Sequence, residues 1–422
     1  MAIELTDEQI QLVKDAVHWF KYESDQVFQY SAPAGAGKTT VMHYIIDQLG
    51  LDYEEVAPMA YTGAASIVMR INGFPYAKTI HSWMYTVQEK TKAVNGKIVK
   101  EISFVRKPLP EEIKLICIDE GAMVPKEMAD EIESRNVKIL VCGDINQLPP
   151  VNSDPSYLTD KRSEKIHYLT QIMRQEKGSS IVELANMILN DQKFRLGNYG
   201  DAWVITTSML TDQMMKEADA ILCSTNRTRD KLTDHIRHDI FGLKSKMPMN
   251  GEKLVCRQNN WAIDCDGLNL ANGMSGIATR GFSVDRYADG KFEIDFTPTM
   301  FPHITFKDLE CDYKFFVSNY EERRYMKSFS GVRRGFNDFG EKFEFGYALT
   351  THLAQGSQYR RGIYIQEPLR DTDLKKLFYT AITRFREKCI YVVPAPRLLV
   401  NIPMDIANLK KAVVSSYGVP VI

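Results

Sequence analysis

The sequence is short of several features that would define a class of protein. Its 422 residues include only seven cysteines, and no two of them form a Cys-x-x-Cys pair. An odd, scattered set fits neither a zinc site nor a disulfide framework, so we expect reduced thiols. No run approaches the roughly 18 consecutive apolar residues of a membrane-spanning helix, so no span is expected. The N-terminus is acidic and lacks the apolar segment of a secretory signal, so we expect a cytoplasmic protein.

An excess of charge of one sign is also missing. The 53 Lys and Arg residues nearly balance the 54 Asp and Glu residues, for a net charge of −1. A protein that coats nucleic acid non-specifically is usually basic overall, so any such binding must come from a local groove. Hydrophobic residues make up 44% of the chain, which is typical of a soluble globular protein. The length predicts about two to four domains.

Apolar periodicity predicts alternating helices and strands. Helical spacing extends over residues 6–22, and a Gly-rich turn is followed by helical spacing from Thr39 to Leu49. Three short apolar runs are typical of buried parallel strands: Val27–Tyr30, Leu115–Asp119 and Ile139–Asp144. The last two runs deliver a carboxylate at the C-terminal end of the strand. The pattern predicts an α/β fold with a doubly wound parallel sheet.

Two stretches interrupt this pattern. Residues 86–108 place Asn95-Gly96 between β-rich runs, which is a strong hairpin signal. Residues 251–344 predict a small β-rich insertion followed by a helical, basic-aromatic stretch. The simplest organisation is two α/β cores, each interrupted by an insertion. The expected boundaries are 1–85 and 110–175 for the first core, 86–109 for its hairpin, 176–250 and 345–422 for the second core, and 251–344 for its insertion.

The strongest local signal is the Gly-rich stretch Ala32–Thr39, which follows a predicted strand and opens a predicted helix. Small residues let backbone N–H groups close around phosphates at a helix N-terminus, where the helix dipole favours anions. Lys38 would pair with the β- and γ-phosphates, and the Thr39 hydroxyl would ligate Mg²⁺. The strict pattern has Gly where this chain has Ala32. The predicted nucleotide-binding residues of this loop are Ala34, Gly35, Ala36, Gly37, Lys38, Thr39 and Thr40.

Two further strand ends supply the chemistry of hydrolysis. Asp119 would ligate Mg²⁺, and Glu120 would orient and deprotonate the attacking water. Gln147, in the string Gly143–Val151, follows the third strand, and its amide can report a γ-phosphate because it both donates and accepts hydrogen bonds. Together these motifs predict Mg²⁺-dependent NTP hydrolysis without indicating its purpose.

The ordered motifs between residues 9 and 384 resemble those of the superfamily 1 helicases, and within them the RecD-like and Dda-like branch of superfamily 1B. The segments similar to family motifs are Pro58–Ala65 (motif Ia), Thr79–Ser82 (the Thr-Ile-His-Ser string), Leu169–Gln175 (motif IV), Thr350–Ser357 (motif V) and Leu377–Arg384 (motif VI). Two positions depart from the family pattern. Ala122 replaces the usual Ser after the acid pair, and Gln358 stands where Glu is frequent.

The resemblance implies two RecA-like cores, with residues 86–109 as a duplex-splitting pin and 251–344 as an SH3-like insertion. It also implies that ATP is the nucleotide, because Gln9 would bind the adenine edge. The alternative is that Gln9 only completes a helix-capping box with Thr6. By the same resemblance, Arg174 and Arg384 would reach the γ-phosphate from opposite sides. Gln355 and Gly356 of motif V are also assigned to the nucleotide.

Contacts with nucleic acid are implied for residues that favour backbone phosphates or could stack on bases. They are Pro58, Thr62, Thr79, His81, Trp83, Val94, Ile98, Thr351 and His352. Trp83 is equally well explained as a core aromatic, and the hairpin as a surface feature without contact to a fork. The basic-aromatic window 321–342 also contains acids and is more typical of a solvated helix face.

These expectations describe an ATP-dependent DNA helicase that moves 5′→3′ on single-stranded DNA and separates duplexes, in replication, repair or recombination. Its expected cofactors are ATP and Mg²⁺. Its expected partners are single-stranded and forked DNA and a single-strand-binding or other replication protein, with no membrane and a monomeric state. Two alternatives stay open: an RNA helicase of the same superfamily, and a DNA-stimulated ATPase that displaces proteins without unwinding.

Overall fold

The structure is a computed structural model that describes residues 5–33, 35–94, 97–150, 153–158, 166–170, 179–266, 268–280, 290–323, 340–369 and 373–394. The chain forms two compact units, Met1–Gln88 with Phe104–Ser179 and Glu89–Ser103 with Ser180–Ile422. All seven cysteines are free thiols, as expected. Within the described ranges, no helix has both the length and the apolar character needed to cross a membrane.

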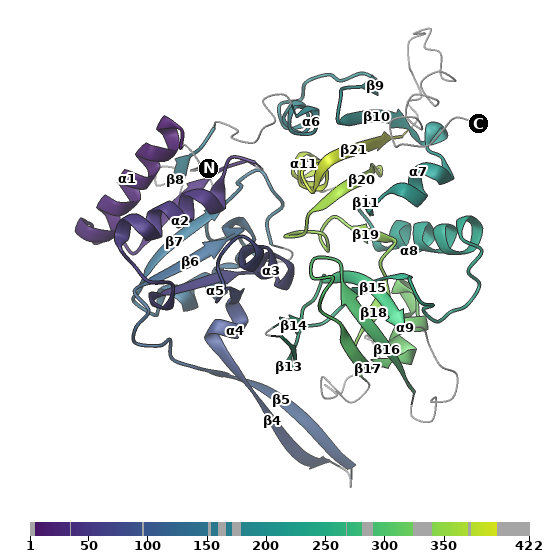
Figure 1. Ribbon diagram of the computed structural model, residues 1–422, viewed down its shortest axis with the longest axis horizontal. Coiled ribbons are helices and arrows are strands. Elements are labelled where there is room, and N and C mark those ends of the chain that lie inside the picture. Colours follow the sequence, from purple (N-terminus) through teal and green to yellow (C-terminus); the bar gives the residue numbers. More distant parts are fainter. Residues whose placement is uncertain are drawn as a thin grey trace. The chain divides into compact units, whose positions relative to one another are not determined.

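The first unit is built on a six-stranded parallel sheet in the order β3-β2-β6-β7-β1-β8 (Figure 1). Its strands are β1 Val27–Ser31, β2 Val56–Ala60, β3 Lys78–Thr79, β6 Leu115–Asp119, β7 Lys138–Gly143 and β8 Ile166–Tyr168. Its helices are α1 Asp7–Tyr22, α2 Lys38–Leu49, α3 Gly63–Ile71, α4 Ile80–Met84 and α5 Lys126–Glu133, with short 3₁₀ turns at Tyr53–Glu55 and Gly121–Met123.

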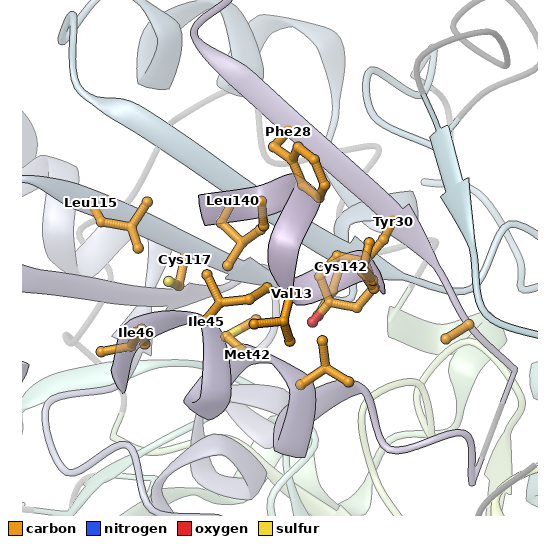
Figure 2. Packing of buried hydrophobic residues seen from close by; sticks show 14 of the residues in the cluster. Val13, Phe28, Tyr30, Met42, Ile45, Ile46, Leu115, Cys117, Leu140 and Cys142 are labelled. Carbon is orange, nitrogen blue, oxygen red and sulfur yellow. The ribbon is translucent and has the colours of Figure 1, made fainter. Parts of the chain in front are cut away.

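Both faces of this sheet are covered by helices. On one face, Val13 of α1 and Ile45 of α2 pack with Phe28 and Leu140 of the sheet (Figure 2). On the other face, buried residues of α4 and α5 pack against alternate residues of the same strands, such as Ile118. Because successive strand residues point to opposite faces, apolar runs without polar alternation were the correct signal for a sheet buried on both sides. The predicted doubly wound α/β class is confirmed.

A two-stranded sheet occupies the segment in which a hairpin was expected (Figure 1). It consists of β4 Tyr85–Val94 and β5 Lys97–Arg106. The expected turn residues, Asn95 and Gly96, lie outside the described residues. The two strands therefore agree with the β-rich runs on either side of Asn95-Gly96, whereas the turn type stays a prediction.

The second unit contains another six-stranded sheet, in the order β19-β11-β20-β21-β10-β9. All its pairings are parallel except that of β9 with β10. The strands are β9 Gly197–Asn198, β10 Ala202–Thr206, β11 Ala220–Cys223, β19 Ala348–Thr350, β20 Tyr359–Ile365 and β21 Phe385–Val393. The helices are α6 Ser180–Leu189, α7 Asp212–Glu217, α8 Asn226–Asp234 and α11 Leu374–Ile382, with a 3₁₀ turn at Thr207–Met209 and a π-helical turn at His235–Ile240.

Between β11 and β19 the chain forms a five-stranded antiparallel sheet, β17-β16-β15-β12-β18, and a small ribbon, β13-β14 (Figure 1). Its elements are β12 Lys253–Cys256, β13 Asn260–Cys265, β14 Leu268–Leu270, β15 Ser275–Arg280, β16 Lys291–Pro298, β17 Phe306–Asp312, α9 Tyr313–Val317 and β18 Phe343–Phe345. The expected β-rich insertion is therefore present, and most of the basic-aromatic window 321–342 lies outside the described residues.

Candidate functional site

The Gly-rich loop joins β1 to α2 with two glycines in left-handed backbone conformations. Gly35 has φ 87° and Gly37 has φ 79°, a region that residues with a Cβ rarely adopt. Gly37 is the N-cap of α2, so Lys38 is the first helical residue and Thr39 and Thr40 follow in the first turn. A Cβ on Gly37 would lie 2.9 Å from Nε2 of Gln9, so this glycine is needed for space as well as for conformation. Ala34 lies outside the described residues.

Gln9 connects the start of α1 to this loop. Its Oε1 accepts from the Thr6 N–H at 3.1 Å, and the Thr6 hydroxyl accepts from the Gln9 N–H at 3.3 Å, which confirms the capping box. Its Nε2 also donates to the Ala36 carbonyl at 3.0 Å, and the residue is only 2% exposed. Sequence reasoning missed this contact with the loop. Gln9 therefore positions the loop in addition to capping α1.

The acidic pair lies at the C-terminal end of β6, close to Lys38. Burial raises the pKa of Asp119, as does the Glu120 carboxylate, while Lys38 lowers it. For Lys38, burial lowers the pKa, but the carboxylates of Glu120, Asp144 and Asp119 raise it by more, so that the pKa lies above its usual value. The three carboxylates thus keep the ammonium charged and leave a site in which a divalent cation would relieve their mutual repulsion.

Two glycines let the ends of β6 and β7 approach closely. A Cβ on Gly121 would lie 2.2 Å from Cγ1 of Val141, and one on Gly143 would lie 3.0 Å from the Gly121 nitrogen. Glu120, just before, has a left-handed φ of 53°, which is costly for a residue with a side chain. Within this turn, the Glu120 N–H donates to Oδ1 of Asp119 at 2.8 Å. Only the acid pair itself could be predicted from the sequence.

Gln147 follows β7 and is 2% exposed. Both its Nε2 and its Oε1 are buried without a hydrogen-bond partner among the described residues. A buried amide left unsatisfied costs about 1–3 kcal/mol, so a partner that both accepts and donates is the expected complement. A phosphate oxygen and a water molecule together would supply both.

Two residues beneath the loop were not singled out from the sequence. The Cys142 thiol donates to Oδ1 of Asp119 at 3.2 Å, and the Tyr30 hydroxyl donates to the Lys38 carbonyl at 2.9 Å. Burial raises the pKa of both groups, Tyr30 and Cys142, and Cys142 adds to the effect on Tyr30. Cys142 thus helps to fix the candidate metal ligand Asp119, and Tyr30 helps to fix the start of α2; both side chains are buried. No local sequence pattern reports such contacts.

The donor set fits a magnesium-bound nucleoside triphosphate. The Thr39 hydroxyl and the Asp119 carboxylate are oxygen ligands of the kind that Mg²⁺ prefers, and Mg²⁺ is usually held by one or two side chains together with phosphates and water. Within the described part of the chain, no group of three or more His, Cys, Asp or Glu residues is placed to hold a metal ion. The unsatisfied Gln147 amide and the Lys38 ammonium provide the complementary contacts for phosphate.

The nucleotide residues expected from motifs V and VI lie in the second unit. Arg384 follows α11, is 3% exposed, and its Nε donates to the Thr380 carbonyl at 3.2 Å. Gln355 is also buried, and Gly356 has a left-handed φ of 78°. Arg174 lies outside the described residues. The first unit brings together Lys38, the acid pair and Asp144.

The residues expected to contact nucleic acid in the first unit have clear local roles. Thr62 and Thr79 are the N-caps of α3 and α4, where their hydroxyls accept backbone N–H groups. Pro58 is buried within β2, and its carbonyl accepts from Nε1 of Trp83 at 2.9 Å. The Lys78 ammonium lies 5.4 Å from the centre of the Trp83 ring. Trp83 is thus anchored at one edge and covered by a cation on a face.

The remaining candidates differ in exposure. His81 is half-buried, whereas His352 is exposed. Thr351 is fully buried, and its hydroxyl donates to the Cys223 carbonyl at 3.2 Å, so it orders the end of β19 instead of facing solvent. Val94 is the last residue of β4, and Ile98 lies in β5. Their contact with nucleic acid stays a prediction.

Comparison with known proteins places these motifs in a family context. A family model described as an AAA domain matches residues 4–208. Among curated relatives, an uncharacterised protein of Methanocaldococcus jannaschii is 23% identical over 90% of this chain and 38% of its own length. The ATP-dependent DNA helicase PIF1 of Saccharomyces cerevisiae is 29% identical over 47% of this chain and 24% of its own length. The chain thus spans well under half the length of these relatives.

The fold also matches a solved structure over almost its whole length. The Pif1 helicase from Bacteroides, crystallised in complex with ADP-AlF3 and single-stranded DNA, has a TM-score of 0.51 and 17% sequence identity, covering 99% of each chain. At this identity the likeness concerns the fold.

Proposed function

We propose that the chain is an ATP-dependent DNA helicase of superfamily 1B, in its Pif1 and RecD-like branch. It moves 5′→3′ on single-stranded DNA and separates duplex DNA. The observation that supports this most directly is the convergence in the first unit of Lys38 with the carboxylates of Asp119, Glu120 and Asp144. The unsatisfied Gln147 amide, whose backbone N–H donates to the Asp144 carbonyl, adds to it. The names of the relatives, which include a DNA helicase and a helicase crystallised with single-stranded DNA, support DNA as the track.

In the proposed cycle, each side chain of this site has a distinct task. The backbone N–H groups after Gly35 and the Lys38 ammonium bind the phosphates, and the Thr39 hydroxyl and Asp119 would bind Mg²⁺, which neutralises charge on the phosphate oxygens. Glu120 accepts a proton from the attacking water. Gln147 changes its hydrogen bonds when the γ-phosphate leaves. These steps convert hydrolysis into a change at the ends of β6 and β7.

By family resemblance, we assign Arg174 and Arg384 to the γ-phosphate as stabilisers of transition-state charge, and Gln355 and Gly356 to the nucleotide. Such an arginine contributes roughly 10³–10⁵ in rate. Residues 86–109 act as the pin that meets the duplex, and 251–344 as an SH3-like insertion. Binding of the single strand brings Arg384, on the second core, to the phosphates, so ATPase activity depends on DNA.

One set of substrates tests the proposal against its alternatives. Unwinding is measured on duplexes with a 5′ tail, a 3′ tail or an RNA loading strand, and on single-stranded DNA blocked by a bound protein. The proposal expects DNA-stimulated ATPase and unwinding only from the 5′ DNA tail. Efficient unwinding from RNA would favour an RNA helicase. Stimulated ATPase that clears the protein block but opens no duplex would favour a remodeller.

A further inference from the structure

The base of the hairpin is attached to the C-terminal end of α5 through one carboxylate. Glu131, in the last turn of α5, accepts a hydrogen bond from the hydroxyl of Tyr85, the first residue of β4. Its Oε1 also lies 3.1 Å from Nε of Arg106, the last residue of β5. A single side chain of the helix therefore binds the first residue of one strand and the last residue of the other.

Arg135, two residues beyond α5, fixes the backbone at the same place. Its Nη1 donates to the Lys107 carbonyl at 2.6 Å, and its Nη2 donates to the Met84 carbonyl at 3.5 Å. The same Nη2 lies 3.5 Å from Oε1 of Glu131. Met84 and Lys107 flank the hairpin, and the Lys107 N–H donates to the Met84 carbonyl at 3.0 Å. The guanidinium group thus holds the chain on both sides of the hairpin.

The helix itself is packed against the strand that ends in the acid pair. Ala129 and Ile132 of α5 are fully buried, and they belong to the same apolar cluster as Ile118 of β6. The short segment between Glu120 and α5 includes the 3₁₀ turn Gly121–Met123. The hairpin is therefore attached to the part of the first unit that carries the acid pair.

These contacts are more than a surface ion pair. The side chains of Arg135 and Glu131 are only 9% and 23% exposed, whereas pairs in full contact with solvent contribute little to stability. Charge-assisted hydrogen bonds are stronger when they are shielded from water. The two strands of the hairpin have ten residues each, and an isolated two-stranded sheet is only marginally stable in water. Contacts at its base are therefore important for its direction.

We propose that Glu131 and Arg135 are positioning residues for strand separation, which hold the hairpin in one direction while the single strand is drawn past it. The inference rests on the proposed function and deepens it, because it assigns this step to residues outside the family-like motifs. Hydrolysis and movement along a single strand use other residues and do not require these contacts. Without them, the hairpin yields to the duplex, and ATP is hydrolysed while the base pairs stay closed.

The first test compares strand separation with hydrolysis in one variant. Glu131→Gln keeps the size of the side chain and an acceptor for Tyr85, but it removes the charge that the two arginines share. Unwinding of a duplex with a 5′ DNA tail should fall by about tenfold or more, since a hydrogen bond to a charged group corresponds to at least that factor. ATPase activity stimulated by single-stranded DNA, and the rate of movement along that strand, should stay unchanged.

A second readout reports on the hairpin itself. Hydrogen exchange, followed by mass spectrometry of a peptide that contains Lys107, measures how often the bond from its N–H to the Met84 carbonyl opens. Glu131→Gln should accelerate this exchange by about tenfold or more, for the same reason. Tyr85→Phe is a milder variant that keeps the ring contact with Phe104. It should lower unwinding and accelerate exchange by smaller factors.

Asp130→Asn is the matched control, because Asp130 is the neighbour of Glu131 on α5 and pairs with Lys126. It should leave unwinding, ATPase activity and hydrogen exchange unchanged. If Glu131→Gln unwinds DNA as well as Asp130→Asn does, or if its ATPase activity falls in proportion to unwinding, the inference is overturned. If the unsubstituted protein hydrolyses ATP but opens no duplex, the proposed function is refuted. Unchanged exchange in Glu131→Gln would overturn the positioning role independently of any activity.

Discussion

The substitution Gln9→Glu, which replaces Nε2 by an oxygen, distinguishes the two proposed roles of Gln9: binding adenine and positioning the phosphate loop. In Gln9→Glu, a carboxylate oxygen still accepts from the Thr6 N–H, but the other oxygen replaces the Nε2 donor and faces the Ala36 carbonyl. The 3.0 Å hydrogen bond becomes a contact between two acceptors in a site that is 2% exposed. Loss of a buried hydrogen bond with an acceptor left unsatisfied costs about 1–3 kcal/mol.

The loss destabilises the phosphate-binding conformation of the loop, because Ala36 directly precedes Gly37, the N-cap of α2. We therefore expect Gln9→Glu to weaken nucleotide binding by about 5- to 150-fold, the equivalent of about 1–3 kcal/mol. If Gln9 acts on the loop, ATP and a triphosphate that lacks the adenine, such as ribose 5-triphosphate, lose affinity by the same factor. Isothermal titration of both ligands measures this directly.

Thr6→Ala is the matched control, since it removes the hydroxyl cap of α1 but leaves the Gln9 amide and its bond to Ala36 in place. It should lower stability by about 1 kcal/mol and leave the affinity for both ligands nearly unchanged. A loss in Gln9→Glu that is confined to ATP would refute the positioning role and leave adenine recognition as the function of this side chain.

Three further predictions concern hydrolysis and strand separation. Lys38→Ala and Glu120→Gln should both abolish turnover, but Lys38→Ala should weaken nucleotide binding whereas Glu120→Gln should retain bound ATP. Equilibrium binding and single-turnover hydrolysis separate the two, and equal loss of binding would refute the roles. Cys142→Ala should raise the Mg²⁺ concentration needed for tight ADP binding several-fold, because Asp119 loses a hydrogen-bond donor. Cys142→Ser should bring this Mg²⁺ concentration back to that of the unsubstituted protein, and a serine variant as weak as the alanine variant would contradict the prediction. Replacing residues 93–99 by a short Gly-Ser turn should preserve DNA-stimulated ATPase while unwinding of a forked duplex collapses, and undiminished unwinding would exclude a pin.

Features set by neighbouring residues were predictable from the sequence. The strand Leu115–Asp119 and the capping box at the start of α1 depend on spacing within a few residues, and both are found where expected. The contact of Gln9 with Ala36 joins residues 27 apart, and that of Cys142 with Asp119 joins residues 23 apart on adjacent strands. Such contacts depend on which strands neighbour each other, which periodicity does not specify.

Burial was harder to predict than secondary structure. Thr351 fits a phosphate contact by residue type, but its hydroxyl is used inside the second unit. Pro58 similarly lies within a buried strand, and its carbonyl accepts a hydrogen bond from Trp83. In both cases the motif is present, but the residue makes a contact inside the protein. Residue types and their spacing within a motif do not predict these contacts.

The register of the first sheet connects the proposed nucleotide and nucleic-acid sites through a single intervening strand, β2. Ala60, the last residue of β2, pairs with Asp119 on one side and with Thr79 on the other. Asp119 is the candidate metal ligand, and Thr79 is the N-cap of α4, which leads directly into the hairpin. Because adjacent strands lie about 4.8 Å apart, the two residues are separated by about 10 Å of hydrogen-bonded backbone. A displacement of Asp119 during hydrolysis therefore has one strand to cross before it reaches the base of the hairpin, and no movement of one unit against the other is needed for that step.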